Sequence, residues 1–160
     1  MTADRDSWCT PAWLATAIGK WDLDPCSNSR SHVLATLRYS LEDGDDGLSV
    51  NSAHSGTRVF VNPPYSRGQV ARWIAAYEHT GFCFLVRFDP STDWFARLYG
   101  LTDLVCLPRR RRVNFEPPPG VSASSNVYPH ALFYRRFSDA TPAIKRLCFS
   151  WRTGNGTKAT

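Results

Sequence analysis

The chain has 160 residues, enough for one domain around one hydrophobic core and too few for two. Hydrophobic residues make up 42% of it and aromatic residues 13%, and no apolar stretch approaches the roughly 18 residues of a membrane helix. The net charge of +5 is a modest excess, compatible with a polyanionic partner but not proof of one.

The N-terminal third of the chain predicts a helix and a strand. Thr10 is the expected N-cap of a helix over residues 12–19, because Pro11 suits the first helical position. A strand over residues 21–24 then runs into a turn at residues 25–28. The residues from there to the next strand are rich in Ser and Gly and lack periodicity, so we expect an irregular segment.

The middle of the chain alternates strands with a helix. Residues 58–61 form a buried strand, which Pro63 and Pro64 end because proline cannot continue the hydrogen-bond ladder. Apolar residues at a spacing of i, i+3, i+4 and i+7 predict a helix over residues 69–79. A second buried strand is expected over residues 81–87.

The C-terminal part begins with a helix that Ser91 or Thr92 caps and that ends at Gly100. The remaining segments are a strand over residues 104–107, a short strand over 113–115, a loop over 116–126, a strand over 131–134, a closing segment over 145–151 and a flexible tail over 153–160.

Strands that alternate with helices predict βαβ units. We therefore expect an α/β fold with a mostly parallel sheet and helices on both faces, in a single domain over residues 1–152. Function in such a sheet lies at the carboxyl ends of the strands. Polar residues follow two of the predicted strands, at residues 25–28 and 62–65. These two ends are the expected site.

The five cysteines are scattered, odd in number and without a CxxC pair, and the four histidines are far apart in sequence. We therefore expect reduced, mostly buried thiols, with no disulfide framework and no metal site. The N-terminus has no apolar segment of the kind in a secretory signal. We expect a cytoplasmic protein without a membrane association or an obligate protein partner.

The most informative motif is Asn62-Pro63-Pro64-Tyr65, at the end of the strand over residues 58–61. A turn forced by proline is one explanation of it. With proline at about 5% of residues, however, a polar-Pro-Pro-aromatic tetrapeptide should arise by chance in well under roughly one chain in a hundred of this length. Its place at the carboxyl end of a strand makes chance a weaker explanation still.

The chemistry of an exocyclic nucleobase amine explains this combination of residues. Such an amine is a poor nucleophile, because its lone pair is delocalised into the ring. The side-chain oxygen of Asn62 and the carbonyl of Pro63 can each accept a hydrogen bond from one of its two N–H groups, which localises that lone pair. The two prolines hold the acceptors in place, and Tyr65 offers a flat face on which an extruded base can stack.

The tetrapeptide resembles the catalytic motif of amino-methyltransferases that use S-adenosylmethionine. Further elements resemble, in the same order, those of the phage and prophage DNA N6-adenine methyltransferases, the phage Dam family. They are Trp8-Cys9-Thr10-Pro11, Leu23-Asp24-Pro25-Cys26-Ser27, Asp46-Gly47-Leu48, Phe60 to Ser66, Asp93-Trp94-Phe95 and Arg112-Val113-Asn114-Phe115. The resemblance extends over about residues 8–135 and implies a Rossmann-like methyltransferase fold, S-adenosylmethionine as cofactor, DNA as substrate, and a phage or prophage gene in a bacterial host.

The resemblance also implies roles for individual residues. Asn62, Pro63, Pro64 and Tyr65 would form the catalytic site and hold the target adenine. The cofactor-binding residues would be Thr10, Pro11, Asp24, Pro25, Cys26 and Asp46. Among these, Thr10 and Pro11 would cradle the methionine end, Asp24 would accept a hydrogen bond from the α-ammonium group, and Asp46 would accept one from the adenine amine.

The sequence departs from the usual pattern of the cofactor site, and a tryptophan often found soon after Asp46-Gly47-Leu48 is replaced by residues 49–52. The glycine-rich turn is absent, and after Asp24 and Pro25 the chain continues with Cys26, Ser27 and Asn28. Small side chains there still permit a close approach of the backbone. For the ribose hydroxyls, Glu42 and Asp43 are both candidates.

Four consecutive arginines, Arg109, Arg110, Arg111 and Arg112, follow the strand over residues 104–107. We expect them to contact DNA phosphates, with Arg112 turned inward, although a solvated basic loop is the alternative. The loop over residues 116–126 is either a recognition loop or a plain connector. Asp93 and Trp94 fit a helix cap and a core aromatic better than base contacts, and Trp8 is also expected in the core.

The function that follows is transfer of a methyl group to N6 of adenine in DNA. Methylation of cytosine N4, of RNA or of protein glutamine uses the same tetrapeptide chemistry and remains open. A nucleic-acid-binding protein that has lost cofactor affinity is the alternative from another class.

Overall fold

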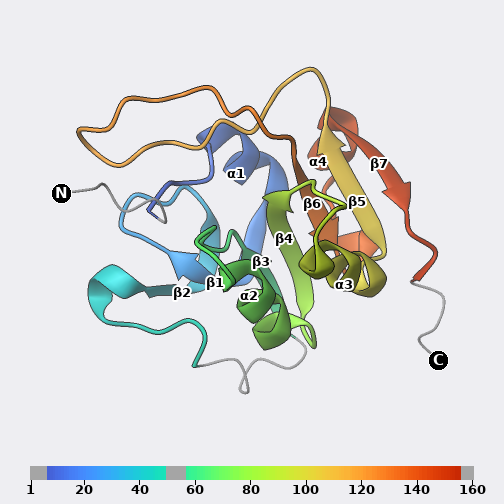
Figure 1. The fold of residues 1–160 in the computed structure, drawn as a ribbon, viewed down its shortest axis with the longest axis horizontal. Helices are drawn as coiled ribbons and strands as arrows, with labels where there is room; N and C mark the ends of the chain where they lie inside the picture. The colour runs from blue at the N-terminus through green and yellow to red at the C-terminus, as the bar shows by residue number, and fades with distance from the viewer. Residues whose placement is uncertain (1–6, 50–56, 156–160) are drawn as a thin grey trace.

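The computed structural model describes residues 7–49 and 57–155 of the chain. Seven strands within these residues form one sheet in the order β2-β1-β3-β4-β6-β5-β7 (Figure 1). The strands are β1 (Lys20–Ser27), β2 (Leu34–Ser40), β3 (Arg58–Val61), β4 (Gly81–Arg87), β5 (Leu104–Pro108), β6 (His130–Tyr134) and β7 (Cys148–Arg152). The helices are α1 (Ala12–Ile18), α2 (Gln69–Tyr77), α3 (Asp93–Leu101) and α4 (Pro142–Leu147), and the 3-10 turns are η1 (Leu41–Asp43) and η3 (Phe137–Asp139).

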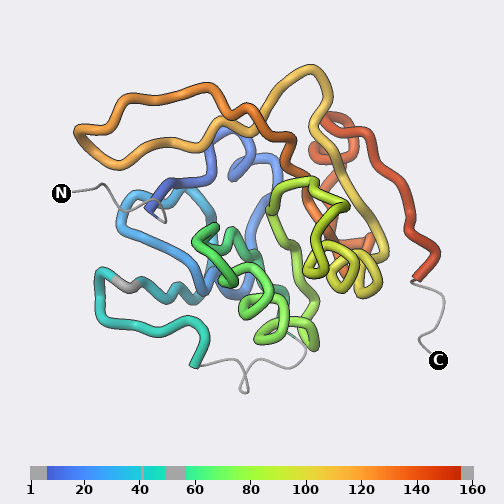
Figure 2. The backbone as a smooth tube through the Cα atoms, viewed as in Figure 1, coloured from blue at the N-terminus to red at the C-terminus, as the bar shows by residue number. Residues whose placement is uncertain are grey.

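The sheet is mixed, which corrects the prediction of a mostly parallel sheet. The pairs β1–β2, β1–β3 and β3–β4 are parallel, whereas β4–β6, β5–β6 and β5–β7 are antiparallel. The cause is the long connection over residues 109–129, which the backbone trace shows as an excursion away from the sheet and back (Figure 2). It returns the chain to the edge at which β4 and β5 end, so β6 starts there and runs in the opposite direction.

The helices cover both faces of the sheet, as predicted. α1 and α4 pack on the face that carries Phe60 and Leu85, and α2 and α3 pack on the face that carries Val61 and Phe84. Consecutive residues of a strand point to opposite faces, so each central strand supplies apolar side chains to both layers. This explains the almost continuous apolar sequence of β4.

Some predicted elements were wrong in kind or place. Residues 25–27 continue β1 instead of forming a turn, and the register of β1 against β2 shifts between Asp24 and Ser27, which accommodates Pro25. The segment expected to be irregular contains β2, an edge strand with mostly exposed residues that lacks an apolar face. Residues 113–115 do not form a strand; next to them, Glu116 forms an isolated bridge with Cys9.

The start of α1, the cysteines and the C-terminal residues can also be compared with their predictions. Pro11, one residue later than expected, is the N-cap of α1. Four of the five cysteines are buried, and Cys26 is half-buried. Of the predicted tail, Thr153 and Asn155 form hydrogen bonds to the end of α3, and residues 156–160 lie outside the described residues. No helix in the part of the chain that the structure describes is long and apolar enough to cross a membrane.

Candidate active site

The carboxyl ends of β1, β3 and β4 lie side by side, because these strands are parallel neighbours. Residues 25–28 lie at the end of β1, and Asn62 follows β3. The antiparallel strand β6 begins at the same edge, where His130 pairs with Arg87 at the end of β4. Two cavities open at this edge of the sheet.

Cavity A has a volume of about 460 Å³. The backbone segment of residues 25–28 forms one wall, and the rings of Trp8, Tyr39 and Trp73 form others. Three carboxylates also line it, those of Glu42, Asp45 and Asp46. Of the six predicted cofactor residues, Pro25, Cys26 and Asp46 therefore line cavity A, and Thr10, Pro11 and Asp24 line neither it nor cavity B.

The loop of Asp46 is held against β1 by a close backbone contact. A Cβ atom on Gly47 would lie 2.1 Å from the carbonyl oxygen of Pro25 and 2.8 Å from the ring of Trp73, so only glycine fits here. The hydroxyl of Tyr77 donates a hydrogen bond to the Gly47 carbonyl, and the Tyr77 ring stacks on Trp73 with centroids 5.9 Å apart. Asp46 accepts a hydrogen bond from the backbone N–H of Leu48 at 3.0 Å, which shapes the turn.

Asp24 lies in β1, directly before the wall of cavity A. Its side chain is 3% exposed, and its Oδ1 accepts a hydrogen bond from the backbone N–H of Cys26 at 3.2 Å. Burial raises the pKa of Asp24 to about 6, although the bond from Cys26 and the charge of Arg38 act in the opposite direction. A carboxylate is thus kept ionised at pH 7 in a place that disfavours its charge.

This raised pKa predicts how stability depends on pH. Folded Asp24 holds its proton up to about pH 6, whereas the unfolded chain loses it near 3.8, so stability falls as the pH rises between these values. The loss at pH 7 is on the order of 3 kcal/mol. Asp24→Asn should therefore be more stable than the parent at pH 7 and should lack this slope. Chemical denaturation at pH 4, 5, 6 and 7 measures both.

The matched control is Asp43→Asn, at an exposed carboxylate in η1. It should leave the pH dependence of the unfolding free energy as in the parent. The burial argument for Asp24 fails if the Asp24→Asn variant retains the parent's decrease in stability between pH 4 and pH 6.

Cavity B has a volume of about 400 Å³ and adjoins cavity A, since Trp8, Asn62 and Pro64 line both. Pro63, Tyr65, Arg87, Phe115 and His130 line it as well, together with residues 124–128 of the long connection. All four residues of the predicted catalytic tetrapeptide therefore surround one cavity. Part of the loop over residues 116–126 contributes to the same wall.

Asn62 lies on the boundary between the two cavities. Its Nδ2 donates a hydrogen bond to the hydroxyl of Thr10 at 3.2 Å. Its Oδ1 is buried and has no hydrogen-bond partner among the described residues. A buried acceptor of this kind costs free energy unless a ligand satisfies it.

Tyr65 is half-buried beside Asn62, and contacts of both its hydroxyl and its ring hold the side chain in place. Its hydroxyl donates a hydrogen bond to the carbonyl of Leu85 at 2.9 Å, and burial raises its pKa, so the phenol stays protonated. The ring meets that of His130 edge to face at 5.6 Å and that of Phe115 at 6.2 Å. Together these rings form an aromatic wall of cavity B.

His130 is a site residue that the sequence reasoning missed. It is 5% exposed, and burial lowers its pKa to about 4, with the charges of Arg87 and Arg112 acting in the same direction. The imidazole is therefore neutral at pH 7. Asn126 lies 2.9 Å from its Nδ1 and also donates to the carbonyl of Val113 at 2.9 Å, which ties the long connection to β6.

Trp8 is a second missed residue, because it was expected in the core. It is half-buried and lines both cavities. Trp94, by contrast, packs with Phe95 against the core face that carries α2 and α3, as predicted for a core aromatic. Sequence alone does not distinguish the two tryptophans, because only the tertiary contacts of residues 7–10 place Trp8 above the sheet edge.

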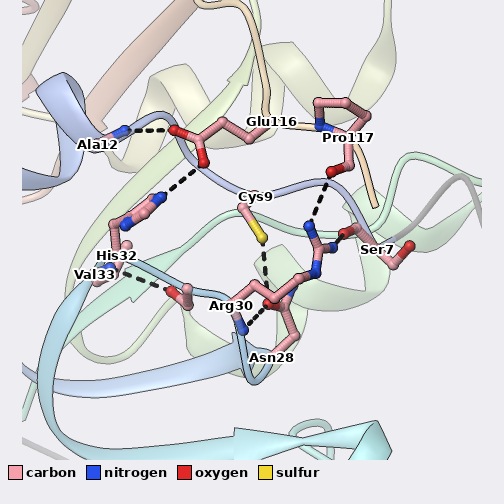
Figure 3. A network of polar contacts seen from close by, with 10 residues as sticks. Ser7, Cys9, Ala12, Asn28, Arg30, His32, Val33, Glu116 and Pro117 are labelled. Carbon is pink, nitrogen blue, oxygen red and sulfur yellow. Dashed lines mark hydrogen bonds and ion pairs between the residues drawn. The ribbon is translucent and has the colours of Figure 1, made fainter. Parts of the chain in front are cut away.

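A network of polar contacts holds that N-terminal segment in place (Figure 3). Cys9 and Glu116 exchange two backbone hydrogen bonds, both 2.9 Å long. The Glu116 carboxylate accepts from the N–H of Ala12 at 3.1 Å and lies 2.7 Å from Nε2 of His32. Arg30 donates to the carbonyls of Ser7 and Pro117. The segment, the loop after β1 and the long connection are thereby joined.

The four consecutive arginines are all exposed, so the expectation that Arg112 points inward was wrong. Arg109 donates to the carbonyl of Arg146 and lies over the ring of Phe149, and Arg111 lies 4.4 Å from the ring centroid of Trp13. Arg110 and Arg112 form no hydrogen bond, ion pair or ring contact with the described residues. Together with Arg111 and His130 they line a third cavity, of about 440 Å³.

The fold and the site define an α/β protein in which two adjoining cavities share an Asn-Pro-Pro-Tyr turn at the carboxyl edge of the sheet. The described residues contain no group of three or more His, Cys, Asp or Glu side chains that could hold a metal ion. The chain matches the family described as DNA N-6-adenine-methyltransferase (Dam) over residues 1–143, and it belongs to this family. It is therefore an adenine-specific DNA methyltransferase. No curated protein and no solved structure matches the chain.

Proposed function

We propose that the enzyme transfers the methyl group of S-adenosylmethionine, bound in cavity A, to N6 of an adenine that is turned out of the DNA helix into cavity B. The observation that carries this proposal is the buried Oδ1 of Asn62 at the boundary of the two cavities, which has no hydrogen-bond partner among the described residues. An amine proton of the target base would satisfy that acceptor. The reacting nitrogen would then face cavity A.

The residues of cavity A suit the chemical groups of S-adenosylmethionine. The rings of Trp73 and Tyr39 can stack on an adenine, and Asp46 can accept from its amino group, as the family resemblance implies. Of the two candidates for the ribose hydroxyls, Glu42 lines the cavity; hydrogen bonds from Ser29 lower its pKa and keep it ionised. When bound there, the cofactor supplies a methyl group on a positively charged sulfur.

Asp24 keeps a proposed role in this site although it does not itself line cavity A. Its ionised carboxylate lies directly behind Pro25 and Cys26, where it attracts an α-ammonium group and orients the Cys26 N–H. The Asp24→Asn variant should therefore gain stability and lose cofactor affinity. Such a conflict between stability and function is typical of binding sites.

In cavity B, the chain's own groups prepare the amine. The Asn62 oxygen and the Pro63 carbonyl accept hydrogen bonds from its two N–H groups, which localises the nitrogen lone pair toward cavity A. The Tyr65 ring, held by Leu85 and His130, offers a surface for stacking the extruded base. Because the amine attacks before it loses a proton, no strong general base is needed.

A direct assay tests the proposal. Purified enzyme, S-adenosylmethionine and unmethylated DNA are incubated, and the DNA is digested to nucleosides for chromatography and mass spectrometry. N6-methyldeoxyadenosine is the expected product. N4-methyldeoxycytidine, or transfer only to RNA or to protein glutamine, would contradict the proposal. Absence of S-adenosylmethionine binding in calorimetry would instead favour a DNA-binding protein without activity.

We propose that the four consecutive arginines, residues 109–112, contact DNA. Their contacts within the protein divide them into two pairs. Arg110 and Arg112 have side chains available for phosphates, whereas Arg109 and Arg111 are engaged within the protein. Each phosphate contact contributes about 0.9 to the slope of log affinity against log salt concentration. Replacing Arg110 and Arg112 together with serine should lower that slope by roughly 1.8. Binding titrations at several salt concentrations measure it.

The matched control replaces Arg109 and Arg111 with serine and should change the slope by less than the first pair. The preferred DNA sequence should be the same in both double variants, because phosphate contacts carry no base identity. Equal slopes for both pairs would mean that the intramolecular contacts of Arg109 and Arg111 do not decide which arginines reach DNA.

Since the substrate is DNA, we also propose that the enzyme works in the DNA-containing compartment of a bacterial host, as a phage or prophage product.

A further inference from the structure

The side chains of Thr10 and Asn62 lie on different elements but meet at the active site. Thr10 is 4% exposed, and its hydroxyl accepts the 3.2 Å hydrogen bond from Nδ2 of Asn62. It lines neither cavity A nor cavity B. The family resemblance assigns Thr10 to the methionine end of the cofactor, so its observed partner calls for a different role.

The residues on both sides of Thr10 are held by hydrogen bonds, which fixes the place of its backbone. On one side, Cys9 exchanges two hydrogen bonds with Glu116, and its Sγ donates to Oδ1 of Asn28 at 3.2 Å (Figure 3). On the other side, the Pro11 carbonyl accepts from the N–H groups of Leu14 and Ala15, both at 3.0 Å, as the first bonds of α1. Thr10 is buried on this held segment, so its hydroxyl meets Asn62 from a fixed stretch of backbone.

An asparagine amide carries an acceptor at one end and two donor protons at the other. The terminal torsion that exchanges these ends is broad, so a free amide presents either one. Only the oxygen can accept a hydrogen bond from an amine, and an NH₂ group in its place would bring N–H donors against the N–H groups of the amine. The bond to Thr10 engages Nδ2, and within residues 7–49 and 57–155 Oδ1 has no hydrogen-bond partner.

We propose that Thr10 is a positioning residue: its hydroxyl, by accepting from Nδ2, holds the Asn62 amide in the orientation in which Oδ1 is available to the substrate amine. This inference rests on the proposed function, since it concerns the same methyl transfer. It assigns Thr10 to the rate of transfer instead of to cofactor binding. The two assignments predict different kinetics.

Thr10→Val tests them, because valine keeps the shape of threonine and removes the hydroxyl. We expect kcat to fall on the order of tenfold, as for the loss of one hydrogen bond, with KM and Kd for S-adenosylmethionine within about twofold. Thr10→Ser retains the hydroxyl and should restore most of kcat. Thr10→Ala removes the hydroxyl without introducing a second methyl group and should repeat the loss. A normal kcat, or a loss confined to cofactor affinity, overturns the inference.

A double-mutant cycle with Asn62→Ala separates positioning from general structural support. If Thr10 acts through Asn62, Thr10→Val should reduce kcat in the parent but should have no further effect in the Asn62→Ala variant. Additive losses would overturn the inference. Parent enzyme in the same assay reports on the proposed function itself, so failure of methyl transfer is distinguished from failure of the Thr10 role.

An NMR measurement does not depend on activity. The side-chain NH₂ signals of Asn62, assigned by their loss in Asn62→Ala, should be protected from hydrogen exchange in the parent and in Thr10→Ser. They should lose that protection in Thr10→Val. Equal protection in all three proteins would contradict the hydrogen bond on which the proposal depends.

Discussion

Replacing Asn62 with alanine should lower kcat for methyl transfer by on the order of 100-fold or more, with little change in the affinity for S-adenosylmethionine. The reason is that the Asn62 amide is held by its bond to Thr10, and its Oδ1 is an acceptor that no group in the described part of the chain engages. Removing one such polar group from a reacting centre costs about 100- to 1,000-fold in rate. Single-turnover kinetics with unmethylated DNA, together with calorimetry of the cofactor, measure the two quantities separately.

Asn155→Ala is a matched control for this substitution. Asn155 is an exposed asparagine whose side chain bonds to the carbonyl of Tyr99 at the end of α3, outside both cavities. It should leave kcat unchanged. If Asn62→Ala retains turnover within a few-fold of the parent, Asn62 is not the acceptor for the substrate amine.

Gly47→Ala should damage the cofactor cavity and the fold together. The new Cβ would lie 2.1 Å from the Pro25 carbonyl oxygen, and backbone atoms cannot move aside without displacing the loop of Asp46 or the end of β1. Overpacking of this kind typically costs about 1–3 kcal/mol of stability. Because both displaced segments line cavity A, we expect S-adenosylmethionine affinity to fall by at least roughly tenfold, or about 1.4 kcal/mol.

Gly100→Ala controls for the exchange of glycine for alanine. Gly100 lies in α3, and a Cβ atom there meets nothing within 4 Å. This variant should be as stable as the parent or more stable by up to about 1 kcal/mol, since alanine favours helix over glycine. Calorimetry and chemical denaturation of both variants decide the matter; cofactor affinity in Gly47→Ala equal to that in Gly100→Ala would refute the close-packing argument.

The buried strands and amphipathic helices were predictable because their patterns are local. The apolar sequence of β4 and the helical spacing of α2 each depend on neighbours within one element. β2 was missed for the opposite reason. It is an edge strand with mostly exposed residues, so its pairing with β1 stabilises it without leaving an apolar pattern in the sequence.

The residues of the site also differ in whether a local sequence pattern predicts them. Asn62, Pro63, Pro64 and Tyr65 could be named from sequence because four consecutive residues carry one chemistry, and the structure groups them around cavity B. Nothing local marks His130 as part of that cavity. It reaches the site because β6 is antiparallel to β4, which the prediction of a mostly parallel sheet did not anticipate.

The sequence by itself determined the α/β class, the buried strands and the Asn-Pro-Pro-Tyr tetrapeptide as a candidate site, since these depend on residues close together in the chain. Only the tertiary structure decided which distant side chains complete the site. Thr10 meets Asn62 across 52 positions, and Glu116 joins the N-terminal segment across more than a hundred, from Ala12. Such contacts depend on the return of the long connection to the sheet edge. That path is set by the packing of the whole chain, and no local pattern encodes it.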